Sequence, residues 1–85
     1  MIVDDERDVL CGGSPLVYLK SLMKSLYFRL EPGQDAKILL LREKFPFGKE
    51  MLSKLATDVG ARLISFDEKQ GEIHIVIRKK YFEKD

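Results

Sequence analysis

The chain has one cysteine, one histidine, three prolines and no tryptophan among its 85 residues. A single cysteine excludes an internal disulfide, which suits a reducing compartment. Cysteine and histidine together supply two of the roughly four ligands that a structural zinc site needs, so we expect no metal site and no cofactor. Since no stretch approaches the roughly 20 apolar residues of a membrane span and residues 1–7 do not resemble a signal peptide, we expect a soluble cytoplasmic protein without a membrane partner.

The charge is nearly balanced. Fifteen Lys and Arg residues stand against 14 Asp and Glu residues, giving a formal net charge of +1. A dedicated nucleic-acid-binding protein normally carries an excess of positive charge, so nucleic acid is not the expected partner. At 85 residues and 45% hydrophobic composition, the chain is long enough for one small core, and we expect residues 1–85 to form a single domain.

Two segments have the apolar periodicity of amphipathic helices. The first extends from about Pro15 to about Leu30, where apolar residues recur every three or four positions. Ser14 is a suitable N-cap, and proline is favoured in the first helical turn. A second helix is predicted over about 49–59, followed by Gly60 where a left-handed C-terminal cap is needed.

Four short apolar runs predict strands. The first is Val9–Cys11, just before the first helix, and the second, 36–41, has the continuous apolar pattern of a central strand buried on both faces. The runs 61–66 and 72–78 are joined by the polar segment 67–71, which contains glycine and indicates a hairpin. The order β-α-β-α-β-β predicts an α+β two-layer sandwich, with two helices on one face of a four-stranded mixed sheet.

Cys11 is the candidate functional residue because it immediately precedes the predicted start of a helix. A helix N-terminus carries a partial positive charge that favours the reactive thiolate form of cysteine. Gly12 and Gly13 remove side-chain bulk beside the thiol and allow unusual backbone angles. The alternative is that Cys11 is a small residue packed in the core, as free cysteines often are.

Beyond these patterns, the chain resembles the TusA/SirA-like family of small sulfur-carrier proteins from about Val9 to Lys80. The resemblance rests on the order of elements and on five short segments: Leu10-Cys11, Pro15-Leu16-Val17, Glu31-Pro32-Gly33-Gln34, Val59-Gly60-Ala61 and Ile75-Val76-Ile77-Arg78-Lys79.

The resemblance implies that Cys11 is the nucleophile and carries a sulfane sulfur, as a persulfide or thiosulfonate, with Gly12, Gly13, Ser14 and Pro15 in support. It implies a carrier rather than a stand-alone enzyme. The implied partners are a sulfur donor, such as a cysteine desulfurase or rhodanese-like enzyme, and an acceptor such as a DsrE-like protein. The family's signature is Cys-Pro-x-Pro, whereas Gly12 stands here in place of the first proline and Pro15 lies one residue further from the cysteine than the second.

Positive charges surround the loop that follows the predicted central strand, and loops at such strand ends often form binding sites. Two interpretations are open: these charges steer an acidic partner or help hold the thiolate, or they are ordinary solvated charges of a surface loop. Phe45 and Phe47 in the same loop are expected to anchor it on the core. The basic residues of this candidate docking surface are Arg42, Lys44 and Lys49.

His74 lies in the last predicted strand, and an outward-facing strand histidine is a simpler interpretation than a base for Cys11. Two other functions remain open for the chain. One is a nucleic-acid-binding or ribosome-associated module, because the family shares its overall fold with the C-terminal domain of a bacterial translation initiation factor. The other is a structural or regulatory interaction domain with a packed, unreactive Cys11.

Overall fold

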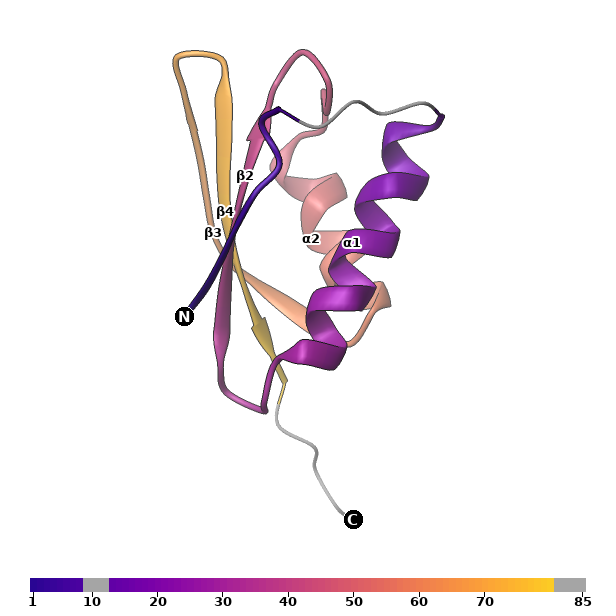
Figure 1. Cartoon of the computed structure of the whole chain (residues 1–85), viewed down its shortest axis with the longest axis vertical. Helices are drawn as coiled ribbons and strands as arrows, with labels where there is room; N and C mark the ends of the chain where they lie inside the picture. The colour runs from indigo at the N-terminus through magenta and orange to yellow at the C-terminus, as the bar shows by residue number, and fades with distance from the viewer. Residues whose placement is uncertain (9–12, 81–85) are drawn as a thin grey trace.

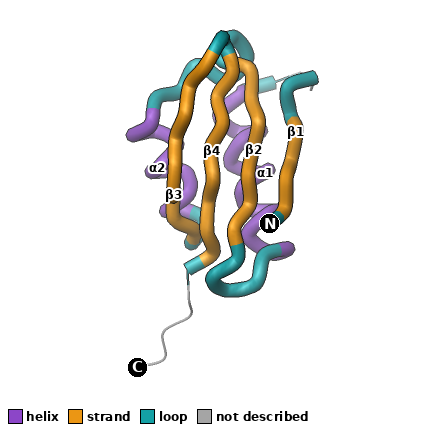
Figure 2. Tube along the Cα trace, turned by 90° about the vertical axis from the view of Figure 1, so that its left-hand side faces the viewer, coloured by secondary structure: helices purple, strands orange, loops and turns teal. Residues whose placement is uncertain are grey.

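A computed structural model describes residues 1–8 and 13–80 of the chain. Two helices pack on one face of a four-stranded sheet (Figure 1), and the other face carries no helix (Figure 2). The predicted two-layer α+β sandwich and its order of elements are therefore confirmed. The elements are β1 (Ile2–Asp5), α1 (Pro15–Arg29), β2 (Asp35–Leu41), α2 (Lys49–Asp58), β3 (Ala61–Lys69) and β4 (Glu72–Lys79).

The sheet has the strand order β1-β2-β4-β3, so β2 and β4 are its interior strands. β1 pairs with β2 in parallel, and the other two pairs are antiparallel. The central position predicted for β2 is confirmed, but the expectation that it is buried on both faces was wrong. Ala36, Ile38 and Leu40 are buried while the residues between them are half-buried, because the helices cover one face only.

The first strand of the sheet is not the run that the sequence pattern indicated. β1 comprises Ile2–Asp5 and pairs with β2 from Ile2 opposite Ala36 to Asp5 opposite Leu39. The expected strand at Val9–Cys11 lies outside the described residues. Parallel pairing with β2 and the packing of Ile2 against the core hold a strand whose two aspartates have low β propensity.

Both helices have the predicted positions to within one residue. The Ser14 side chain accepts a hydrogen bond from the Val17 amide, 3.4 Å away, and Pro15 opens α1. Leu19, Met23 and Leu26 form the buried stripe of this helix. α2 ends at Asp58, and Gly60 beyond it has a φ of 94°, which confirms the left-handed cap expected there.

The core lies between the helices and the sheet and contains no buried polar or charged residue in the described part of the chain. Phe45 is fully buried and its ring centroid lies 6.0 Å from that of Tyr18, so it anchors the loop after β2 as expected. Phe47 is partly buried against the same core. The buried residues are Leu19, Met23, Leu26, Leu30, Ala36, Ile38, Leu40, Phe45, Leu52, Leu55, Ala56, Ala61, Ile73, Ile75 and Ile77.

β3 and β4 form the predicted hairpin, with a tighter turn than the segment 67–71. The strands extend to Lys69 and Glu72, and the turn residues Gln70 and Gly71 have φ values of 53° and 78°. Positive φ at both central positions is the signature of a type I′ turn, whose twist matches that of the strands. A register shift between Leu63 and Ser65 interrupts the pairing of β3 with β4.

Gly60→Ala is expected to destabilise the fold by about 1–3 kcal/mol, because an L side chain is strained at positive φ. A methyl group there would also lie 3.1 Å from the Tyr27 ring. Urea denaturation measures the loss. Gly13→Ala is the matched control, since a Cβ at Gly13 meets nothing within 4 Å and its φ is not positive. Equal stability of the two variants would contradict this account of Gly60.

Candidate functional site

The structure describes the helix start that follows the candidate cysteine. Cys11 and Gly12 lie outside the described residues, and Gly13, Ser14 and Pro15 lie within them. The first turn of α1 contains no acidic residue, so no carboxylate offsets the partial positive charge of this helix end from within the turn. The described part of the proposed site is therefore a capped helix N-terminus that favours a nearby anion.

Of the two roles that the sequence suggested for the glycine pair, the structure bears on the backbone angles at Gly13. Its φ lies outside the left-handed region, and a Cβ built on it meets no atom within 4 Å. The unusual backbone angles expected for the glycine pair are thus not used at this position. Among the described residues, none fills the space that a side chain at Gly13 would take.

A tyrosine and a glutamate that the sequence analysis missed join β1 to α1. The Tyr18 hydroxyl donates a short hydrogen bond to the Glu6 carboxylate, and the Tyr18 ring packs near Phe45. A hydrogen bond with the Asp4 carboxyl and partial burial raise the pKa of Glu6, and the bond from Tyr18 opposes this shift. In the sequence, Tyr18 lies next to the buried stripe of α1, and this position indicates a side chain at the edge of the core. Nothing in the sequence indicated that Glu6 is its hydrogen-bond partner.

The three basic residues of the candidate docking surface have different roles in the structure. Arg42 donates to the Phe47 carbonyl at 3.3 Å and to the Glu68 carboxylate at 3.1 Å. Lys44 donates to the carbonyl of Arg7 at 3.2 Å, whereas Lys49 is exposed at the start of α2. Arg42 and Lys44 therefore hold the loop against its neighbours, and their role in docking stays a prediction.

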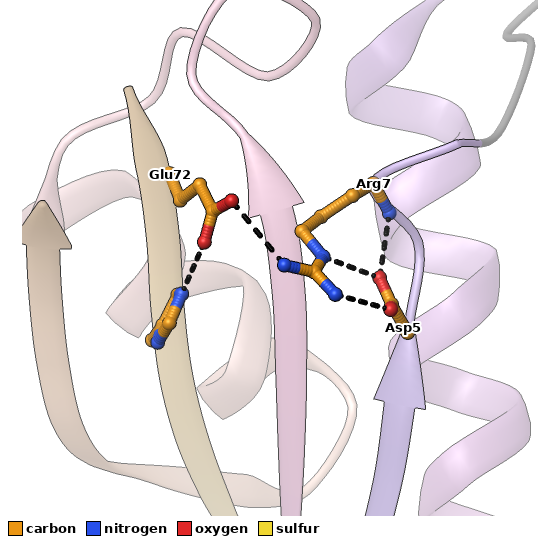
Figure 3. Close-up of polar contacts among 4 residues, drawn as sticks. Asp5, Arg7 and Glu72 are labelled. Carbon is orange, nitrogen blue, oxygen red and sulfur yellow. Dashed lines mark hydrogen bonds and ion pairs between the residues drawn. The ribbon is translucent and has the colours of Figure 1, made fainter. Parts of the chain in front are cut away.

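A chain of charged side chains crosses the uncovered face of the sheet (Figure 3). The Arg7 guanidinium donates to Asp5 at 2.8 and 2.7 Å and to Glu72 at 3.2 Å, and His74 Nε2 lies 2.9 Å from Glu72 Oε1. The hydrogen bonds from Arg7 lower the pKa of Asp5 to about 2. Hydrogen bonds with His74 and then Arg7 lower the pKa of Glu72.

His74 faces outward, as expected, on the side of the sheet away from the helices. Its strand neighbours Ile73 and Ile75 face the core. Because α1 packs on the core side, the sheet separates the imidazole from the start of that helix. The structure therefore offers no support for His74 as a base at the candidate site.

The described residues offer neither a metal-binding cluster nor a membrane-spanning helix. Residues 1–8 and 13–80 contain no group of three or more His, Cys, Asp or Glu side chains placed to hold a metal ion. In the same part of the chain, neither helix is long and apolar enough to span a membrane.

Comparison with known proteins supports the fold and names no family. No family model and no curated protein matches the chain. The solution structure of HP1264 from Helicobacter pylori is similar, with a TM-score of 0.64 and 21% sequence identity over 95% of this chain and 100% of that one. At this identity the likeness shows a shared fold only.

Glu6→Gln is expected to increase stability at pH 7, because the raised pKa means that the ionised carboxylate is disfavoured in the folded state. The stability contributed by protonated Glu6 is present at low pH and is lost as pH rises through the folded pKa. Urea denaturation at pH 4 and pH 7 measures the difference, which should be small at the lower pH. A variant that is less stable than the parent at both pH values would contradict the assignment.

Arg7→Gln is expected to raise the pKa of Asp5 from about 2 toward its usual value near 4, because the guanidinium bonds are lost. The depressed pKa stabilises the fold above pH 4, and this contribution is lost as pH falls toward 2. Carboxyl NMR titration measures the shift. Arg29→Gln removes the same charge from the last turn of α1 and should leave the pKa of Asp5 unchanged. An equal shift of the Asp5 pKa in both variants would indicate that the loss of net charge, and not the loss of the Arg7 bonds, is the cause.

Proposed function

We propose that the chain is a sulfur carrier of the TusA/SirA-like kind, with Cys11 as the residue that holds the sulfur. The observation that supports this most is the start of α1, a capped helix N-terminus without acidic residues that follows the cysteine by three residues in the sequence. The β-α-β-α-β-β order agrees with the resemblance. Gly12 in place of proline and a first strand that ends six residues before Cys11 are the departures from it.

The transfer needs only one thiolate and a docking surface. The Cys11 thiolate attacks the terminal sulfur of a donor persulfide, the donor's S–S bond breaks, and the donor leaves as a thiolate. The new Cys11 persulfide is then attacked at its terminal sulfur by an acceptor thiolate, and Cys11 leaves as a thiolate. The two exchanges involve no net oxidation, so no further cofactor is required.

The features around α1 fit the needs of such a carrier. The helix N-terminus stabilises a thiolate as nucleophile and as leaving group. Gly12 and Gly13 add no side-chain bulk beside the thiol, which eases the approach of donor and acceptor proteins. The bond from Lys44 to the Arg7 carbonyl fixes the chain just before the segment that contains Cys11.

Incubation with a cysteine desulfurase and cysteine, or separately with tetrathionate or polysulfide, is expected to load Cys11. Intact-protein mass spectrometry should show a gain of one sulfur, or of a thiosulfonate group, that a thiol reductant reverses. The Cys11→Ser variant should keep the fold and gain nothing, because its hydroxyl is not a sulfur nucleophile at neutral pH.

Alkylation of the native protein supplies the control for access. Iodoacetamide should modify Cys11 without denaturant, with a rate that rises with pH to a midpoint below the usual thiol pKa of about 8.5. Slow labelling that becomes rapid only after unfolding would indicate a packed cysteine. Loading that persists in Cys11→Ser would also overturn the proposal.

A further inference from the structure

A hollow of about 890 Å³ lies at the edge of the sheet, between α2 and the neighbouring start of β3 and end of β4, at the opposite end of these strands from the hairpin turn. Ser53 and Thr57 line it from α2, and Arg62 and Leu63 line it from β3. Three consecutive basic residues at the end of β4, 78–80, complete the lining. None of these residues is acidic, so the described walls of the hollow carry positive charge only.

Two of the cations have no carboxylate partner. The side chains of Arg62 and Lys80 make no hydrogen bond or ion pair within the described residues. The ammonium group of Lys79 donates to the Leu30 carbonyl at 3.0 Å and lies 4.4 Å from the centroid of the Tyr27 ring. These partners are neutral and hold the ammonium group against the end of α1, on the helix side of the sheet.

The register of the hairpin places two arginines opposite each other. Arg62 pairs with Arg78 across β3 and β4, on the same face of the sheet. Like charges directly opposite in a sheet repel each other. Arg78 is bonded to Asp35 at 2.6 Å, whereas no acidic group of residues 1–8 or 13–80 is bonded to the Arg62 side chain. An anion bound at Arg62 would therefore relieve a repulsion that the described residues leave in place.

The remaining walls suit an anion that carries an organic group. Ser53 and Thr57 lie four residues apart, on the same side of α2, and their hydroxyls are donors for phosphate oxygens. The planar guanidinium of Arg62 has the geometry for two bonds to one phosphate group. Leu63 supplies apolar surface for the part of a ligand that is not charged.

We propose that this hollow binds a small phosphorylated organic molecule, with Arg62 and Lys80 contacting its phosphate groups. Its volume of about 890 Å³ lies within the roughly 300–1,000 Å³ of small-molecule sites and is much larger than inorganic phosphate needs. A net charge of +1 favours such a ligand over a long nucleic acid. The site is independent of Cys11, so it stands whether or not the chain carries sulfur.

Titration with ADP, pyrophosphate and adenosine, followed by calorimetry and by amide NMR shifts, tests the proposal on the whole chain. ADP and pyrophosphate are expected to bind and to shift the amides of Thr57, Arg62 and Lys80, and adenosine is not. Arg62→Gln is expected to weaken ADP binding about tenfold, because it removes charge-assisted hydrogen bonds. Arg62 is exposed and unpaired among the described residues, so the substitution should leave the fold intact.

Lys69→Gln is the matched control. It removes the same charge from the same strand, seven residues and about 23 Å from Arg62. ADP binding should change less than twofold in this variant. An equal loss in both variants would show general electrostatic attraction, and binding of adenosine as tight as that of ADP would exclude phosphate recognition. If a mixed-sequence single-stranded RNA bound more tightly than ADP and this binding were lost in Arg62→Gln, the ligand would be a nucleic acid and not a small molecule. Each of these three results would overturn the proposal.

Discussion

Burial of the isoleucine row of β4 beneath two helices is the constraint on which the rest of the structure depends. Ile73, Ile75 and Ile77 occupy one face of an interior strand, opposite buried residues of β2, and the last two also lie opposite packed residues of β3. Because the helices cover this face alone, each strand must alternate between core and solvent. The solvent face therefore holds the charges of the sheet, and several pair across strands, as Arg78 does with Asp35.

Charge pairing on that face also explains how so short a first strand is retained. β1 has four residues and one neighbour, and its end is held from both sides of the sheet. On the outer face Arg7 bonds to Asp5 and Glu72, while on the core side Glu6 accepts a bond from Tyr18 of α1. Surface ion pairs contribute little individually. Here the bonds of the consecutive residues Asp5, Glu6 and Arg7 fix the position of the chain just before the segment that contains Cys11.

The parts of the fold that the sequence revealed are those governed by local signals. Helix periodicity, the Ser14-Pro15 start and the Gly60 cap located both helices, and the turn at 70–71 was close to the predicted hairpin connection. β1 was missed because two aspartates interrupt its pattern and its stability comes from pairing with β2. The link between Glu6 and Tyr18 and the hollow beside Arg62 were missed because both join residues of separate elements, which spacing along the chain does not reveal.

The two proposed sites lie toward opposite ends of α1, and the electrostatics of that helix suit both. The segment with Cys11 precedes its positive end, whereas Lys79, which lines the hollow, donates to the Leu30 carbonyl at its negative end. Fifteen residues of helix span about 22 Å, so a ligand in the hollow does not touch the start of α1. Lys79 lines the hollow and its ammonium group donates to the Leu30 carbonyl, so this residue joins the hollow to the end of α1. Any influence of such a ligand on the thiolate would therefore pass through the C-terminal turn of α1.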